Sequence, residues 1–338
     1  MNERDILLDI LKGLGIFLVV FAHTYKGHIG ELIYLFHMPL FFTLSGCALV
    51  YSKRQREVGV KKYLRSLIIP YFVFSFFSFV YWCWVELNFR TPHKSGIFSG
   101  LIGSLDFRIQ EFINIFTAFS VKGAFEYNIV MWFLPCLFCS LVLYKFLKLK
   151  FEKYLPYSIA GIVAVSFYTQ EFTPSLPWCF EIAVVTLPFV YIGDSCYLRI
   201  KADNSLKWGI IALLTIIIIV VTTHPIVHMR SHVYASWWQF YLVSFSFIYL
   251  CIVFCRLILH HEYGILQWLG RNSIIIMCLH EPIKRIVLYI VSVVFRYEMM
   301  TIRTSILTSL IIVVLVIGGI YPLVSIINRY APFMLGKS

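Results

Sequence analysis

A basic residue and a histidine bracket the first apolar segment of the chain, at Lys12 and His23. On a helix, the eleven residue steps between them turn about 20° beyond three full turns, so both side chains share one face about 16 Å apart. Imidazole can accept or donate a proton at neutral pH. Asp9 lies three residues before Lys12, where a helix can pair opposite charges. The pattern fits a reaction centre, and it also fits a helix whose polar ends only fix its depth in a membrane.

The composition of the chain indicates a membrane protein. Of its 338 residues, 60% are hydrophobic and only 14% are charged, which leaves too little polar surface for a water-soluble globule. The net charge of +12 could suit nucleic acid, but the lysines and arginines fall in short clusters between apolar runs. Topology signals are distributed in this way. We therefore expect the lipid bilayer as a partner and no nucleic acid.

Apolar runs predict an all-α membrane protein with about ten transmembrane helices. The expected spans are 6–25, 32–51, 66–87, 129–146, 156–169, 182–198, 208–223, 237–259, 272–294 and 305–327. The densest basic run follows the second span and is cytoplasmic by the positive-inside rule, which places both termini in the cytoplasm. Segment 88–127 predicts one or two interfacial or re-entrant helices on the outer face. We expect one membrane-embedded domain over residues 1–338.

Ionisable side chains inside apolar spans are candidate functional sites, because a charge at the centre of a bilayer costs about 2.5 kcal/mol or more. The residues to explain are His23, His37, Glu181, Asp194, His280, Glu281, Lys284 and Arg285. His37 and His280 are each followed two residues later by a proline, which opens the backbone hydrogen bonding of a helix. The alternative for His37 is a buried ring that is hydrogen-bonded to a backbone carbonyl.

The spacing of histidines and cysteines does not favour a metal site. Three histidines near the outer leaflet could meet in one cavity, but they show none of the short spacings typical of zinc ligands. A second group, at intervals of four, is His224, His228 and His232. Pro225 and Arg230 interrupt it, which favours an exposed loop. Cys136 and Cys139 form an isolated CxxC inside an apolar span, which favours helix packing. We expect no metal cofactor.

Six segments, in their order and spacing, resemble the blocks of acyltransferase family 3, the integral membrane acyltransferases. They are LDILKGLGIFLVVFAHT, FHMPLFFTLSG, YLRSLIIPYFVFS, MWFLPCLF, LPFVYIGDSCYLR and LGRNSIIIMCLHEPI. The likeness covers nearly the whole chain, and FHMPLFFTLSG is its most specific block. It implies ten helices with both ends in the cytoplasm. It also implies transfer of an acyl group, usually acetyl, from a cytoplasmic coenzyme A thioester to a hydroxyl of an extracytoplasmic saccharide or lipid-linked glycan.

The resemblance also implies roles for particular residues. His23 matches a histidine regarded as essential in the first helix of the family, and Lys12 stands where the family usually has arginine. Lysine keeps the charge but lacks the planar fork that binds phosphate or carboxylate through two hydrogen bonds. Arg65 matches the basic residue before the third helix, and Ser45 with Gly46 matches the SG pair.

The residues and the resemblance lead to one mechanism. The phosphates of coenzyme A cannot enter hydrocarbon, so the nucleotide should stay at a basic cytoplasmic mouth. That mouth is expected to include Arg54, Arg56, Lys61, Lys62 and Arg65. The pantetheine arm would run about 16 Å along the first helix, from Lys12 to His23. We expect His23 to be the general base, with His37 or Ser45 orienting it or donating to the carbonyl oxygen. An acyl-imidazole on His23 is the second variant.

Two other classes of protein stay open from the sequence. A glycan or lipid-linked saccharide transporter (flippase) would also bury ionisable residues among ten helices. A membrane sensor or scaffold would keep the fold without the reaction, and Lys12 in place of arginine is the feature that leaves this class open. For the transferase, we expect acetyl-coenzyme A or another acyl-coenzyme A as donor and a saccharide or glycan as acceptor. The expected location is the cytoplasmic (inner) membrane, with multiple spans.

Overall fold

The computed structural model describes residues 5–52, 59–89, 107–120, 124–170, 175–202, 206–258 and 264–337. Within these residues every regular element is helical, apart from one bridged pair, His228 and Val233. The all-α prediction is therefore confirmed. Arg54 and Arg56, two residues of the expected basic mouth, lie outside the described residues.

The described helices occur along the chain in the following order. They are α1 (Ile6–Thr24), α2 (His28–Tyr34), α3 (His37–Ser52), α4 (Val60–Tyr63), α5 (Ile69–Phe89), α6 (Phe107–Thr117), α7 (Phe133–Phe151), α8 (Leu155–Thr169), α9 (Phe180–Val185), α10 (Leu187–Ala202), α11 (Leu206–Thr223), α12 (Trp237–Ile258), α13 (Gly264–Arg271), α14 (Ser273–Phe295), α15 (Met299–Thr304) and α16 (Ile306–Tyr330). Shorter helical turns occupy Leu64–Ile68, Glu152–Tyr154, Pro177–Cys179, Met229–Ser231 and Pro332–Leu335.

Six of the described helical segments are long and apolar enough to cross a membrane. They are Ile6–Thr24, His28–Val50, Val60–Val85, Leu206–Thr223, Trp237–Arg256 and Ile306–Tyr330. The pair Pro177–Val185 and Leu187–Ala202, bent by 55°, could form a seventh span. Helices α7, α8 and α14 also occur where spans were expected, but α8 has only 15 residues, and α7 and α14 carry several charged residues. The count of ten spans and the orientation of the termini stay predictions.

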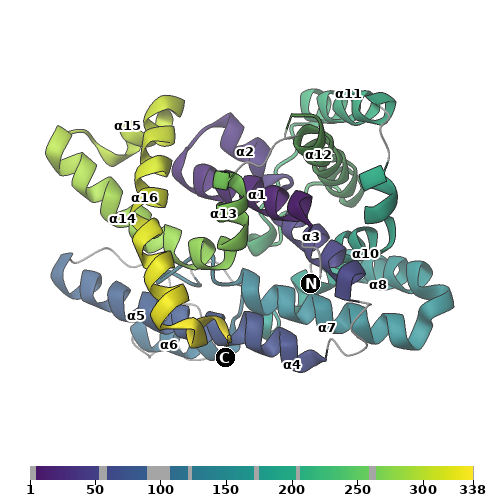
Figure 1. Cartoon of the computed structure of the whole chain (residues 1–338), viewed down its shortest axis with the longest axis horizontal. Helices are drawn as coiled ribbons and strands as arrows, with labels where there is room; N and C mark the ends of the chain where they lie inside the picture. Colours follow the sequence, from purple (N-terminus) through teal and green to yellow (C-terminus); the bar gives the residue numbers. More distant parts are fainter. Residues whose placement is uncertain are drawn as a thin grey trace.

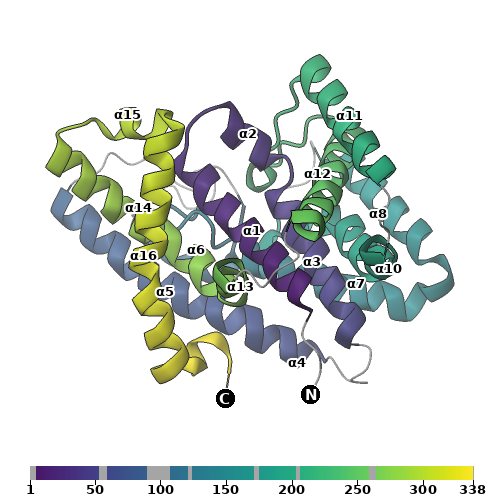
Figure 2. The same cartoon turned by 45° about the horizontal axis from the view of Figure 1, so that its top comes forward.

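Helix α1 lies at the centre of the molecule (Figure 1). It packs against α13, α14, α3, α16 and α12. The contact with α13 is close, because a Cβ added at Gly270 would lie 1.8 Å from the carbonyl oxygen of Asp9. Figure 2 shows the start of α1 and the end of α16 toward one side of the molecule, while the end of α1 approaches α2 and α15 on the other. Helix α1 therefore connects two ends of the fold.

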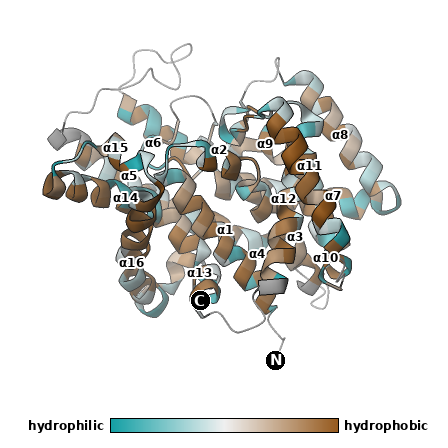
Figure 3. Ribbon diagram, turned by 90° about the horizontal axis from the view of Figure 1, so that it is seen from above, coloured by the Kyte–Doolittle hydropathy of each residue, from teal (hydrophilic) through white to brown (hydrophobic). Residues whose placement is uncertain are grey.

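Apolar side chains cover much of the outside of the molecule. On α11, the exposed residues include Ile217, Ile218 and Val221, and on α16 they include Leu307 and Val314. Figure 3 shows both helices as predominantly hydrophobic. Such faces would associate in water, and in a bilayer they meet lipid. The chain is a multi-pass membrane protein.

Helix α6 places its polar side chains inward. Gln110, Glu111 and Asn114 are buried, whereas Phe112 and Phe116 are exposed. A helix with this inverted pattern is suited to an apolar environment beside the protein. One of the helices expected within 88–127 is therefore present, and its position at a membrane interface stays a prediction. Residues 90–106 and 121–123 of that segment are not among those described.

Two spans differ in detail from the sequence prediction. The second starts at His28 and breaks at Leu35 and Phe36, whose N–H groups bond to carbonyls three residues back. The third is helical from Val60 rather than from residue 66, and includes a π-helical turn at Leu64–Ile68. This turn lies directly before Pro70, which lacks an N–H group to continue regular α-helical bonding.

Candidate active site

A large cavity lies where the end of α1 meets α2, α3, α5, α14 and the loop before α12. Its volume is about 1090 Å³. Ionisable residues in its wall include His23, His37, Glu281 and Lys284. Aromatic residues in its wall include Tyr34, Tyr81, Trp82 and Trp132. A cavity of this size, mainly apolar with a few converging polar groups, is where a reaction centre is expected.

His23 lies in the last turn of α1 with its ring at this cavity. Its ring centroid is 5.4 Å from that of His280, 5.8 Å from that of Tyr34 and 6.4 Å from that of His37. The Tyr34 hydroxyl oxygen is 3.5 Å from His23 Nδ1, a long hydrogen-bonding distance. The structure therefore brings His23 and His37, both predicted site residues, into one group with two further rings.

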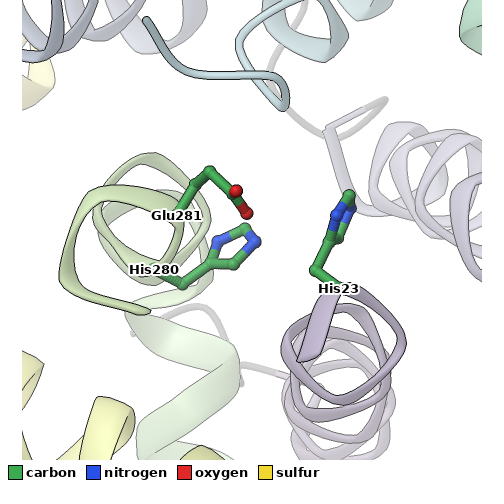
Figure 4. A group of neighbouring side chains, drawn as sticks. All are labelled: His23, His280 and Glu281. Carbon is green, nitrogen blue, oxygen red and sulfur yellow. The ribbon is translucent and has the colours of Figure 1, made fainter. Parts of the chain in front are cut away.

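A carboxylate faces His23 from α14. Figure 4 shows the ring of His23 opposite Glu281 and His280, which are adjacent in sequence. The Glu281 side chain is only 8% exposed, and its Oε2 lies 2.6 Å from Lys284 Nζ. Its Oε1 lies 3.6 Å from Arg285 Nε. A buried carboxylate needs such partners, and here two cations fix it beside the imidazole.

The backbone at the end of α1 is held by two cationic side chains. Lys284 Nζ donates to the carbonyl oxygen of His23 at 3.0 Å. Arg303 donates to the same oxygen through Nη2 at 2.8 Å, and to that of Thr24 through Nε at 2.9 Å. The last carbonyls of a helix have no partner within the helix, and positive charge stabilises that end. These contacts fix the position from which the His23 ring projects.

The two other buried histidines share one hydrogen-bonding pattern. His37 Nδ1 is 2.8 Å from the carbonyl oxygen of Ile33, and His280 Nδ1 is 2.8 Å from that of Met277. In a neutral ring Nδ1 then carries the proton, so Nε2 is a hydrogen-bond acceptor. Among the described residues, the buried Nε2 of His280 has no hydrogen-bond partner. Both rings therefore present a free acceptor nitrogen to their surroundings.

A proline near each of these histidines frees one helical carbonyl, and another helix uses it. Pro39 has no N–H for the carbonyl of Leu35, which instead accepts from Ser244 Oγ at 2.6 Å. Pro282 likewise frees the carbonyl of Cys278, which accepts from Asn128 Nδ2 at 2.8 Å. The two prolines thus help to anchor α3 and α14, which carry His37 and His280.

The group His23, His280 and Glu281 has ligand atoms that all lie within 4.8 Å of one another. Three such ligands are a common number for catalytic zinc. However, the Lys284 ammonium group already compensates the Glu281 carboxylate at 2.6 Å, and it would repel a metal ion. The arrangement favours proton transfer over metal binding. That the protein uses no metal cofactor stays a prediction.

The histidines spaced at four-residue intervals do not form one site. They lie in the loop between α11 and α12, as expected. His228 joins the wall of the large cavity, with its ring centroid 5.3 Å from that of Tyr34. His232 instead has its Nε2 3.2 Å from Glu181 Oε1. The loop therefore folds back over the cavity, which the sequence did not predict.

A second cavity of about 610 Å³ lies toward the start of α1. Its wall contains Lys61, Lys62 and Arg65, three residues of the predicted basic mouth. Arg271 and Lys337 add two further positive charges. Residues from α4, α13 and the C-terminal turn therefore form one strongly basic site, which matches the expected character of the mouth.

Two further predicted site residues within the described part of the chain line neither cavity. Lys12 is half-buried on α1 and lines neither of them. Ser45 donates to the carbonyl oxygen of Phe41, at 2.8 Å within α3, and also lines neither. Asp9 accepts from Arg271 Nε at 3.2 Å, so it ties α1 to the wall of the second cavity.

Two of the buried carboxylates are explained by contacts outside both cavities. Asp194 forms an ion pair with Lys148 and accepts from the Tyr144 hydroxyl at 2.7 Å. Glu181, the partner of His232, accepts from the backbone N–H of Leu176 at 3.0 Å. Both carboxylates fasten neighbouring helices or loops and take no part in the site.

Sequence reasoning missed Tyr34, Arg230 and Arg303 at the large cavity. One signal was available. In the predicted topology, Arg230 and Arg303 lie in outer loops, where the positive-inside rule disfavours basic residues. Arg271 and Lys337 of the second cavity gave no comparable signal, because basic residues on the cytoplasmic side are ordinary.

The fold and the site together define a multi-pass membrane protein with a buried centre of imidazoles and one carboxylate. The chain belongs to acyltransferase family 3, because a family model described as an acyltransferase domain matches residues 5–325, nearly the whole chain. Searches of curated proteins and of solved structures gave no match. The resemblance found in the sequence is thus confirmed, and membership supports acyl transfer as the general activity.

Proposed function

We propose that the protein transfers an acyl group, most simply acetyl, from cytoplasmic acyl-coenzyme A to a hydroxyl of a saccharide or glycan on the other side of the cytoplasmic (inner) membrane. The observation that carries the proposal is the position of His23, at a large cavity and beside the buried carboxylate of Glu281. The proposal includes ten spans with both termini in the cytoplasm.

His23 is the general base in this reaction. Its Nδ1 hydrogen-bonds to the Tyr34 hydroxyl at 3.5 Å, and its Nε2 accepts the proton of the acceptor hydroxyl as the oxygen attacks the thioester carbonyl. The ring becomes positively charged in this step. Glu281 stabilises that charge from within the same buried group. The proton then passes to the leaving thiolate of coenzyme A, which balances the reaction.

The developing oxyanion requires positive charge or a hydrogen-bond donor. Lys284 has its ammonium group between Glu281 and the His23 carbonyl, so we assign the oxyanion stabilisation to it. His37 orients the acceptor in this proposal, because its neutral Nε2 accepts a hydrogen bond and does not donate one. We assign no proton transfer to Ser45, since its hydroxyl donates within α3.

The donor binds from the opposite end. The basic cavity formed by Lys61, Lys62 and Arg65 with Arg271 suits the phosphates of the coenzyme A nucleotide. Helix α1 runs from Asp9, which binds Arg271, to His23 at the large cavity. The pantetheine arm follows this helix past Lys12, over about 16 Å.

The test uses the full-length protein in nanodiscs with radiolabelled acetyl-coenzyme A and a panel of oligosaccharides. A general base contributes about 100-fold or more to the rate, so His23→Ala should lower acceptor labelling by at least that factor. His28→Gln is the matched control, because His28 is exposed and lines neither cavity. Both variants must insert and elute as wild type does. Undiminished transfer by His23→Ala would refute the assignment.

The same material separates the other hypotheses. Acid quenching of a reaction without acceptor would reveal a labelled protein if an acyl-imidazole forms, and the label should be absent from His23→Ala. Transport of a saccharide across the membrane of proteoliposomes, with no radiolabelled acetyl group transferred to any saccharide, would indicate a transporter.

A further inference from the structure

The wall of the large cavity carries more positive than negative charge. Its cationic residues are Lys26, Arg230, Lys284, Arg285 and Arg303, and Glu281 is the one carboxylate among its described lining residues. Four positive charges are therefore in excess. In the proposed topology, Lys26, Arg230 and Arg303 also lie on the outer side, against the positive-inside rule. A charge excess at such a place indicates a ligand that compensates it.

The excess is not removed by ion pairs within the described residues. Lys284 and Arg285 share Glu281. Arg303 binds the carbonyls of His23 and Thr24, which uses two of its N–H groups without neutralising its charge. The Lys26 ammonium group has no hydrogen bond or ion pair among the described residues. Desolvation at the cavity wall and the neighbouring charge of Arg303 lower the pKa of Lys26, and the charge of Glu281 offsets part of this shift.

Two glutamates near Arg230 leave most of the excess in place. Burial raises the pKa of Glu111 to about 9, so this carboxyl is neutral at pH 7. Glu126 is close to Arg230 and Arg285, and its backbone carbonyl accepts from Arg285 Nη2 at 3.1 Å. It does not line the cavity, and one such charge would balance only one of the four.

Arg230 is the cation best prepared for a ligand. It lies in the helical turn Met229–Ser231, between the bridged residues His228 and Val233. Its carbonyl accepts from Ser120 Oγ at 2.5 Å. Its guanidinium donates through Nη1 to the carbonyl of Ala124 at 3.1 Å, which leaves further N–H groups of the planar fork for a ligand. A fixed guanidinium fork matches the two oxygens of a carboxylate or phosphate.

The rest of the wall is suited to sugar rings. Tyr81 and Trp84 line the cavity and are not buried, so their flat faces are apolar surfaces for the C–H faces of a pyranose. Trp82 and Trp132 in the same wall are only 4% and 6% exposed. Polar contacts at a few points then fix the orientation of such a ligand. The combination of aromatic faces with an excess of cations fits a saccharide that carries negative charge.

We propose that the acceptor is an anionic saccharide, whose carboxylate or phosphate group is bound by Arg230 with Lys26 while its hydroxyl reaches His23. The inference rests on the proposed function for the transfer step, and it specifies the acceptor class. A uronic acid and a sugar linked to lipid through phosphate share this chemistry.

Matched acceptors test the charge directly in wild-type protein in nanodiscs. One pair is a uronic-acid oligosaccharide and the same oligosaccharide with its carboxyl groups reduced to alcohols. A second pair is a sugar 1-phosphate and its neutral parent sugar, and together the pairs distinguish carboxylate from phosphate. A charge-assisted hydrogen bond of this kind changes affinity, and with it kcat/KM, by about tenfold or more. The kcat/KM for at least one acidic acceptor should exceed that of its neutral partner by this factor, and equal use within both pairs would overturn the proposal.

Variants then locate the recognition. Arg230→Gln should lower the acidic-over-neutral ratio of kcat/KM by about tenfold, and Arg230→Lys should restore part of it because the charge is kept. Lys150→Gln is the control, since Lys150 is an exposed cation at the end of α7 that does not line this cavity. A wild-type ratio in Arg230→Gln would overturn the assignment to Arg230.

A binding measurement separates this inference from the proposed function. The quenching of tryptophan fluorescence by each oligosaccharide reports occupancy next to Trp82 and Trp132 without any transfer. If no acceptor is acylated but the acidic saccharide binds about tenfold tighter than its neutral partner at low salt, the transferase proposal fails and the anionic-ligand inference stands. If both saccharides bind equally, the inference fails whatever the transfer assay shows.

Discussion

Hydrogen bonding at single residues determines which site groups can accept a proton. His37 and His280 bind backbone carbonyls through Nδ1, so each neutral ring exposes an acceptor at Nε2. Lys284 is a donor nearby, and the Tyr34 hydroxyl accepts from His23 Nδ1 in the tautomer that leaves Nε2 free to act as the base. The site therefore contains several groups able to receive a proton and a fixed cation able to stabilise an oxyanion, which are the requirements of acyl transfer to a hydroxyl.

The buried carboxyl of Glu111 predicts a pH dependence of stability. Burial raises its pKa from 4.5 to about 9. Between these values the folded state holds a proton that the unfolded state releases, so stability falls as the pH rises through this window, and the penalty is absent below pH 4.5. Glu111→Gln should therefore give a higher Tm than wild type at pH 8 and a similar Tm near pH 4.5.

Thermal unfolding in nanodiscs from pH 4.5 to pH 8 measures this difference. The exposed Glu152 gives a matched control, since Glu152→Gln makes the same chemical change on the surface. If the plots of Tm against pH for Glu111→Gln and wild type stay parallel over the whole range, the Glu111 carboxyl is not the source of the pH dependence of stability.

The sequence predicted part of the site because apolar spans make ionisable residues conspicuous. His23, His37, Glu281 and Lys284 were found in this way. Tyr34 and Arg230 were missed, because tyrosines are common at membrane interfaces and the segment around Arg230 was expected to be an exposed loop. Only the folded loop shows that Arg230 reaches the same cavity as His23.

Close contacts between helices determine how the site-bearing elements are placed. Helices α3 and α10 meet through two glycines: a Cβ at Gly46 would lie 2.2 Å from the Val190 carbonyl oxygen, and one at Gly193 would lie 2.1 Å from that of Thr43. Real Cβ atoms do not approach this closely, so the glycines allow the two backbones to touch. In the SG pair that matched the family, Ser45 and Gly46, the glycine is therefore explained by this close contact between helices.

Replacing Gly46 by alanine should therefore force α3 and α10 apart. We expect Gly46→Ala to destabilise the protein by about 1–3 kcal/mol, the usual cost of overpacking. Gly161→Ala on α8 is the control, because a Cβ there meets no atom within 4 Å. Alanine should stabilise that helix by up to about 1 kcal/mol. Thermal unfolding of both variants measures this difference. Equal Tm values for Gly46→Ala and Gly161→Ala would contradict the close packing of α3 against α10.

For the helices, the sequence predicted where they lie along the chain but not where they break. The apolar runs gave α1, α11, α12, α14 and α16 to within a few residues. The break between α2 and α3, the bend of 55° before α10 and the short helix α13 were not predicted. These features depend on partners distant in sequence, such as Ser244 for the freed carbonyl of Leu35.

The whole molecule has a basic cavity at one end of α1 and the larger cavity at the other. The C-terminal turn completes the basic cavity, where Gly336 has φ +65° and an added Cβ would lie 1.9 Å from the Arg65 carbonyl oxygen. Any side chain at Gly336 would displace this turn from Arg65. The end of the chain is therefore coupled to the proposed donor site.

Donor affinity tests this coupling. Arg65→Gln should weaken binding of a non-hydrolysable acyl-coenzyme A analogue by about tenfold, through one lost charged contact. Gly336→Val should weaken it as well, although it changes no charge. Lys150→Gln controls for net charge and should bind as wild type does. Equilibrium binding at two salt concentrations is the measurement, and wild-type affinity in both Arg65→Gln and Gly336→Val would exclude the basic cavity as the donor site.

The contacts that hold α1 have a consequence for how the protein is made. Asp9 pairs with Arg271, and the carbonyl of His23 binds Lys284 and Arg303. Helix α1 leaves the ribosome long before these partners do. The Asp9 carboxylate meets Arg271, and the His23 carbonyl meets Lys284 and Arg303, only after the last quarter of the chain is inserted. Assembly of the reaction centre is therefore a late event in biogenesis, and a chain that stops before α13 would leave these polar groups for quality control to recognise.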